Sequence, residues 1–225
     1  MFLEAYETLH SHLGPSHWWP GETSFEVMVG AVLTQNTSWK NVEKALHRLS
    51  SEKAIRPEIM HKTPVGTLAQ WIRSSGYFNQ KARRLLALLD WYQNYDFRVE
   101  TVRRRHPDSE SVRRELLSIS GIGPETADSI LCYAFSYPVF VVDAYTHRWL
   151  ERYDSGGHRA AAGNYHLLQS MVQSEFAHSF RAEELTRHFN EFHALIVRLS
   201  NLYCKKSSPL CRDCPLQRKC QNART

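Results

Sequence analysis

The spacing of apolar positions along the chain predicts helices rather than strands. Apolar residues at 25, 28, 29, 32 and 33 recur close to every 3.6 residues, which predicts a helix over residues 25–45. Leucines at 85, 86, 88 and 89 predict another helix over residues 81–91. We find no convincing run in which apolar and polar residues alternate as they would in a half-buried strand. The pattern therefore predicts an all-α fold.

Residues 113–135 have the pattern of two helices joined by a tight turn. The first helix ends near Ile119, Ser120–Gly123 form the turn, and Pro124 stands where helices favour proline, at the first position. Glu125 follows in the first turn, where an acid suits the helix dipole. Two glycines let the backbone approach another surface, and N–H groups at a helix start can bind an anion. This is the helix-hairpin-helix pattern that grips DNA phosphates, although Gly-x-Gly alone is more often a plain helical hairpin.

Asp143 directly follows the apolar run of residues 139–142. A carboxylate at that point is expected to be partly desolvated, with a perturbed pKa. It is also expected to cap the helix that begins at Ala144. One residue can do both, so Asp143 is a candidate for catalysis and for capping.

The excess positive charge of the chain lies in its last residues. The net charge is +5, and from Cys204 onward six lysines and arginines face one acid, Asp213, while the rest of the chain has 22 of each sign. A basic patch suggests a polyanionic partner, although a solubilising tail explains the charge equally well.

Four of the five cysteines lie in this basic tail, at Cys204, Cys211, Cys214 and Cys220. Zinc usually takes two matched C-x2-C pairs, and only one is present. Four thiolates from one short segment suit a [4Fe–4S] cluster, so we expect these cysteines to be its ligands, with zinc or no metal as alternatives. Cys132 lies in an apolar helical stretch and is expected to be a small buried side chain.

The start of the chain lacks the basic and apolar regions of a signal peptide. The longest largely apolar stretch, 131–142, is interrupted by Ser136 and Pro138 and is too short to cross a bilayer. We therefore expect a cytoplasmic protein with no membrane partner.

In order and spacing, Gly121-Ile-Gly123, Val-Asp143 and the loop 204–220 resemble the endonuclease III superfamily of DNA glycosylases. The resemblance implies an all-α, two-lobed helix-hairpin-helix glycosylase fold with DNA in the groove between the lobes and a C-terminal iron–sulfur loop. Residues 23–133 would form a six-helix lobe, and residues 1–22 with 134–225 the other. It also implies a monomer that acts on double-stranded DNA containing a damaged base, associated with the nucleoid.

The segments His17–Pro20, Phe25–Thr37, Gly76–Lys81 and Gly123–Tyr133 are similar to those of bacterial type-III 3-methyladenine DNA glycosylases. This resemblance implies catalysis by Asp143. The implied base pocket consists of Trp18, Trp19, Trp39 and Glu125. The implied DNA contacts are Gln35, Tyr77, Asn79, Lys81, Gly121 and Gly123. Gln35 and Tyr77 would fill the gap left by the flipped base. Core packing of the tryptophans, a helix-end hydrogen bond of Gln35 and a partly buried Tyr77 are the structural alternatives.

Two positions depart from the patterns of these families. Bifunctional members carry an imine-forming lysine two residues after the second hairpin glycine, where this chain has Glu125. Some 3-methyladenine glycosylases place a lysine where this chain has Asn201. We therefore expect a monofunctional hydrolase of N-glycosyl bonds, with doubtful abasic-site lyase activity, that releases alkylated purines. The alternatives are a glycosylase for oxidised pyrimidines or mismatched bases and a non-catalytic DNA-binding iron–sulfur protein.

Overall fold

The computed structural model describes residues 1–16, 21–154 and 158–223, and no β-strand occurs among them. The chain divides into two compact units. We call Met1–Trp18 with Pro138–Thr225 the terminal unit, and Trp19–Tyr137 the central unit. In the described part of the chain, no helix is long and apolar enough to cross a membrane.

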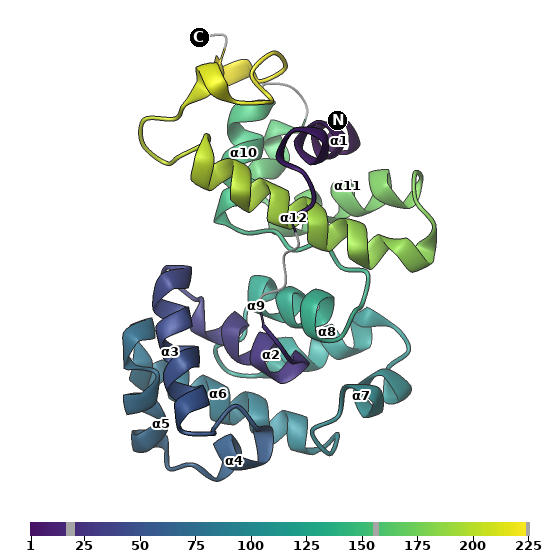
Figure 1. Cartoon of the computed structure of the whole chain (residues 1–225). Helices are drawn as coiled ribbons and strands as arrows, with labels where there is room; N and C mark the ends of the chain where they lie inside the picture. Colours follow the sequence, from purple (N-terminus) through teal and green to yellow (C-terminus); the bar gives the residue numbers. More distant parts are fainter. Residues whose placement is uncertain (17–20, 155–157, 224–225) are drawn as a thin grey trace. The chain divides into compact units, whose positions relative to one another are not determined.

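The terminal unit, whose helices are labelled in Figure 1, is built around an aromatic core. The ring of Phe192 stacks on Phe140 and on Phe176, and Trp149 meets it edge to face. Such contacts bury a large apolar area and fix the angles between helices. The helices and 3-10 turns are α1 (Phe2–Leu13), α10 (Ala144–Tyr153), η3 (Arg159–Gly163), α11 (Tyr165–Ala177), η4 (Ala182–Glu184), α12 (Leu185–Leu202), η5 (Cys211–Asp213) and η6 (Gln221–Ala223).

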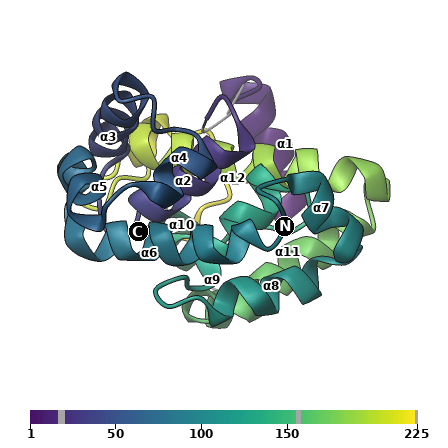
Figure 2. The ribbon, with the colours of Figure 1, turned by 90° about the horizontal axis from the view of Figure 1, so that it is seen from below.

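The central unit surrounds α2 (Ser24–Leu33), which is apolar on nearly all sides and is therefore buried. The other elements are α3 (Trp39–Ser51), α4 (Pro57–Lys62), α5 (Val65–Trp71), η1 (Arg73–Ser75), α6 (Phe78–Gln93), α7 (Val99–Arg105), α8 (Ser109–Ser118), α9 (Pro124–Ser129) and η2 (Ile130–Ala134), the last a turn of π-helix. The neighbours of α2 include α3, α6, α9 and η2, and α6 also packs against α4 and α5 (Figure 2).

The single helix predicted over residues 25–45 is wrong, because the chain leaves the helix after Leu33 and re-enters it at Trp39. The polar residues between explain the break. The Thr34 hydroxyl donates to the Gly30 carbonyl at 2.7 Å, and Asn36 has a left-handed φ of 53°. Short polar side chains compete for backbone hydrogen bonds and tolerate this conformation, so they end helices.

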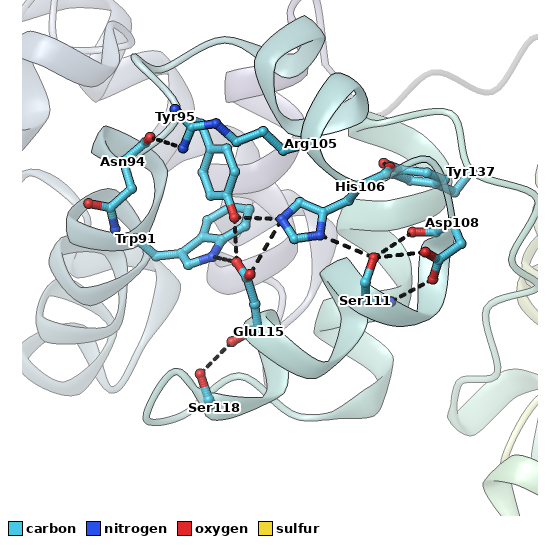
Figure 3. A network of polar contacts seen from close by, with 10 residues as sticks. All are labelled: Trp91, Asn94, Tyr95, Arg105, His106, Asp108, Ser111, Glu115, Ser118 and Tyr137. Atoms are coloured by element: carbon cyan, nitrogen blue, oxygen red, sulfur yellow. Dashed lines mark hydrogen bonds and ion pairs between the residues drawn. The ribbon is translucent and has the colours of Figure 1, made fainter.

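The predicted hairpin is confirmed: α8 ends at Ser118 and α9 begins with Pro124 at its first position. A network of polar contacts around Glu115 holds α8 in place (Figure 3). Glu115 accepts hydrogen bonds from Trp91 at 2.7 Å and Tyr95 at 2.5 Å, and faces His106 at 3.3 Å. Burial alone would raise the pKa of Glu115, but these donors and the charge of His106 hold it below its ordinary value. The first helix of the hairpin is therefore tied to α6 by a charge-assisted cluster.

Candidate functional site

The two hairpin glycines of the central unit have different surroundings. Gly121 has a φ of +86°, and a Cβ atom there would lie 2.4 Å from Nε of Arg84. Gly123 has an extended backbone that any residue can adopt, and a Cβ there would meet nothing within 4 Å. The chain itself therefore requires a glycine at 121, whereas the bare backbone at 123 is open to an external partner.

Gln35 is bound to this hairpin. Its Nε2 donates to the Gly121 carbonyl at 3.0 Å and to Oγ1 of Thr126 at 2.9 Å, and its Oε1 accepts from Arg84. The structural alternative for Gln35 was a hydrogen bond at the end of its own helix. The bonds instead reach Gly121, Thr126 and Arg84, which lie far from Gln35 in the sequence. The structure therefore joins Gln35 to the hairpin through Arg84 and Thr126, neither of which the sequence pattern identified.

Lys81 is 1% exposed, and its ammonium is turned inward. Nζ donates to the carbonyls of Leu33 and Ser75, both at 2.7 Å. Burial, with a smaller effect from the charge of Arg84, lowers the pKa of Lys81 to about 8. In this conformation Lys81 holds together the segments that lead into Gln35 and Tyr77, and its charge is not presented to a DNA phosphate.

Tyr77 lies at the surface. It is 66% exposed and caps α6 with a left-handed φ of 46°, so the alternative of a partly buried tyrosine is wrong. Asn79, in the first turn of α6, is exposed as well. A large exposed aromatic ring on a short turn is available to a partner.

The expected base-pocket residues are described only in part. Trp18 and Trp19 lie outside the described residues. Trp39 is half-buried, and its ring lies 3.8 Å from where a Cβ of Gly30 would stand, so the glycine makes room for the ring against α2. Glu125 is exposed in the first turn of α9.

In the terminal unit, Asp143 is 8% exposed and is the N-cap of α10, as expected. Oδ1 accepts from the backbone N–H of Thr146 at 2.8 Å and from its hydroxyl at 2.9 Å. Oδ2 lies 3.3 Å from Nε2 of His193, a residue on α12 that the sequence analysis missed. Burial alone would raise the pKa of Asp143, but His193 and Thr146 together hold it below its ordinary value. The cap therefore carries a buried, ionised carboxylate.

Two arginines of α10 anchor the cysteine loop. Nε of Arg148 donates to the Cys204 carbonyl at 3.0 Å. Arg152 donates to the Lys205 and Lys206 carbonyls and approaches Sγ of Cys204 at 3.5 Å. The start of the loop is thus fixed to the helix that Asp143 caps.

The four loop cysteines are free thiols of intermediate exposure, and Cys132 is buried as expected. Burial is the main cause that raises the pKa of Cys214 to about 11, and the three other loop cysteines add repulsion. Among the described residues, no group of three or more His, Cys, Asp or Glu side chains is arranged to hold a metal ion. The donor set fits an iron–sulfur cluster in chemistry, because four thiols on one short loop are the ligands that such a cluster takes.

Residues 29–165, which contain the hairpin and Asp143, match the family described as HhH-GPD superfamily base excision DNA repair protein. A Methanocaldococcus jannaschii protein, named provisionally as a DNA repair glycosylase, is 37% identical over 221 residues, covering 98% of this chain and 96% of that protein. Endonuclease III of Thermotoga maritima is 27% identical over 197 residues, 88% of this chain and 82% of that protein.

Among solved structures, the 3-methyladenine DNA glycosylase of H. pylori bound to 1,N6-ethenoadenine is similar with a TM-score of 0.68 and 30% identity. The similarity covers 88% of this chain and 95% of that one.

Proposed function

This chain belongs to the HhH-GPD superfamily of base excision DNA repair proteins, and from that premise we propose that it is a monofunctional DNA glycosylase for alkylated purines of the 3-methyladenine type. The expected all-α helix-hairpin-helix fold and the resemblance to the endonuclease III superfamily are confirmed. The choice of substrate and the absence of lyase activity are inferences from individual residues.

Glu125 is the observation that carries the monofunctional assignment. The side chain is exposed in the first turn of the hairpin's second helix, where bifunctional enzymes of the resembling family carry their lysine. A carboxylate cannot attack the sugar to form an imine, so it cannot start strand cleavage by that route. The reaction then ends with an abasic site in an intact strand.

Asp143 is the group we propose for the chemistry of base release. Loss of the base leaves positive charge on the sugar, and a carboxylate stabilises that charge and orients the attacking water. Oδ1 is committed to Thr146, so Oδ2 is the oxygen left for this task. The lowered pKa keeps the carboxylate ionised, as the task requires.

Base flipping gives roles to the surface residues of the central unit. A base within a duplex is out of reach, so it must turn out of the stack and its place must be filled. Tyr77 is exposed and can enter the duplex as it stands, whereas Gln35 must exchange its bonds to the hairpin for contacts with DNA. Gly123, with open space around it, is suited to close approach of a phosphate, and Gly121 and Asn79 would support this contact.

We propose Trp18, Trp19, Trp39 and Glu125 as base-pocket residues, with the three tryptophans as an aromatic cage. N-alkylated purines carry a positive charge, and a cation over a good aromatic face gains roughly 0.5–2 kcal/mol. Normal purines lack this attraction. The similarity to the 3-methyladenine DNA glycosylase of H. pylori supports this choice of substrate.

For the cysteine loop we propose a [4Fe–4S] cluster held by Cys204, Cys211, Cys214 and Cys220. The cluster would fold the loop and leave the reaction to other groups. Lys205, Lys206 and Arg212 are exposed on this loop and would contact DNA phosphates. We further propose that the protein acts as a monomer on double-stranded DNA in the cytoplasm.

The test is release of free base from methylated duplex DNA by the wild-type protein and by Asp143→Asn. We expect release of 3-methyladenine by the wild type and a loss of orders of magnitude in the variant, with duplex binding retained, because charge stabilisation and phosphate contact use different groups. Release of thymine glycol or mismatched thymine instead would favour the alternative of a glycosylase for oxidised pyrimidines or mismatched bases. No release from any lesion would support a non-catalytic DNA-binding protein.

A further inference from the structure

We propose that His193 is a positioning residue for Asp143: its Nε2–H donates to Oδ2 and keeps that oxygen ionised and aimed while Thr146 holds Oδ1. The proposal rests on the proposed catalytic role of Asp143 and adds a partner to it. It assigns a function to a buried histidine on α12 that no motif of the chain singled out.

The geometry places both groups where a partner is required. Asp143 is 8% exposed and His193 is 7% exposed, and Nε2 lies 3.3 Å from Oδ2. A buried charge without a partner is costly, and so is a buried imidazole nitrogen. Since α10 packs against α12, the two side chains face each other across one helix interface.

His193 stands among apolar side chains on α12. Its buried neighbours on α12 include Phe189, Phe192, Leu195 and Ile196. A histidine on such a face is usually a satisfied core residue, and packing alone would be served better by leucine or phenylalanine. The ring of His193 faces the buried carboxylate of Asp143, the residue that caps α10. This placement favours a functional role for the contact between them.

Several other charged groups of these helices bond to partners away from Asp143. On α12, Arg198 donates to the Leu13 carbonyl and Glu191 accepts from Ser16. On α10, Arg148 and Arg152 donate to backbone carbonyls of the cysteine loop. The turn η6, which also packs against α10, has no titratable side chain. Among the described residues, His193 is thus the titratable side chain that the structure pairs with Asp143.

The charge of Asp143 is what base release would use. An ionised carboxylate places a negative charge beside the sugar, which stabilises the positive charge that develops there. Without the donor, burial acts on Asp143 with only Thr146 opposing it, and the carboxyl group takes up a proton more readily. The protonated acid has no charge to offer the sugar, so base release would fail at the acidic end of the pH range.

The experiment compares pH profiles of single-turnover base release for the wild type, His193→Phe and His193→Gln, with duplex affinity measured alongside. We expect the acidic limb of His193→Phe to move to higher pH, with about a tenfold loss of rate for each pH unit below the new pKa. His193→Gln retains an N–H donor but no charge, so its acidic limb should lie between those of the wild type and His193→Phe. Duplex affinity should be the same for all three.

His188→Phe is the matched control. His188 lies on the same helix but bonds to the hydroxyl of Tyr6 and stacks on Phe180, so its loss should leave the pH profile unchanged. An unmoved limb in His193→Phe, or an equal shift in His188→Phe, would overturn the positioning role. If Asp143→Asn releases base at the wild-type rate, the proposed catalytic role of Asp143 is wrong, whatever His193→Phe shows. The catalytic role of Asp143 and the positioning role of His193 can therefore fail separately.

Discussion

The side chain of Arg84 lies in the space that a Cβ atom of Gly121 would need, with Nε 2.4 Å from that position. The same guanidinium donates to Gln35, which in turn bonds to the Gly121 carbonyl. The hairpin turn, the arginine and the glutamine therefore form one packed unit, and the glycine at 121 serves the protein's own packing.

Gly121→Ala and Gly123→Ala are expected to separate folding from DNA binding. Alanine at 121 would clash with Arg84 and adopt a left-handed backbone, at a cost of about 1–3 kcal/mol of unfolding free energy. Alanine at 123 meets open space and an extended backbone, so the stability should change by less than about 0.5 kcal/mol.

Among the described residues nothing lies within 4 Å of a methyl group at 123, so we expect bound DNA to encounter it and the affinity of Gly123→Ala for duplexes of any sequence to fall. Urea unfolding and duplex titration at one salt concentration measure the two effects. Wild-type affinity in Gly123→Ala would mean that no phosphate approaches the backbone there.

Lys81→Met is expected to lower stability, because the carbonyls of Leu33 and Ser75 lose their donor. Each unsatisfied buried carbonyl costs about 1–3 kcal/mol. The pH dependence follows from the pKa of Lys81, which burial lowers from 10.5 to about 8. Between these values the unfolded chain binds more protons than the folded one, so this group makes wild-type stability rise with pH from about 8 to about 10.5.

Lys81→Met should lack that rise, so its stability gap to the wild type should widen across the same window. Unfolding free energies from pH 7 to 10.5 test this, with Lys44→Met, a change of an exposed lysine on α3, as the control. A gap that stays constant with pH would show that Lys81 is not a buried ammonium.

Local features of the structure were predictable from the sequence. Pro124 at the first helical position, Asp143 as a cap and the burial of Cys132 each depend on a few neighbouring residues. Propensity and apolar spacing operate over that range, and they also gave the all-α fold.

Contacts between distant residues were not predictable in the same way. His193 lies 50 positions after Asp143, and nothing in either segment marks the pair. Lys81 follows a polar turn and is typical of a surface cation, yet backbone carbonyls from two other segments enclose it. The helix break after Leu33 was missed because apolar spacing hides the effect of short polar side chains on the backbone.

Cys211→Ser and Cys132→Ala should differ in metal content. The purified wild type is expected to be yellow-brown, with broad absorbance near ~400 nm and about four irons per chain. Cys211→Ser should lose the colour and much of the fold of the loop, since cluster binding is coupled to local folding. Cys132 is buried in the central unit, so Cys132→Ala should keep both iron and colour. A colourless wild type containing one zinc would contradict the cluster.

Glu125→Lys should convert the chemistry at the abasic site. In the wild type, borohydride is expected to trap no protein–DNA adduct, and strands should break only after hot alkali. A lysine at 125 provides an amine that can attack C1′ of the sugar to form an imine, which borohydride reduces to a stable adduct. The position is exposed, so the charge change costs only about 0.3–1 kcal/mol at the helix start.

Glu110→Lys makes the same change in the exposed first turn of α8 and should give no adduct. Efficient trapping of the wild type would show that another lysine forms the imine, and the monofunctional proposal would fail. If Glu125→Lys releases base and still escapes trapping, residue 125 does not reach the sugar, and Glu125 no longer explains why the strand stays intact.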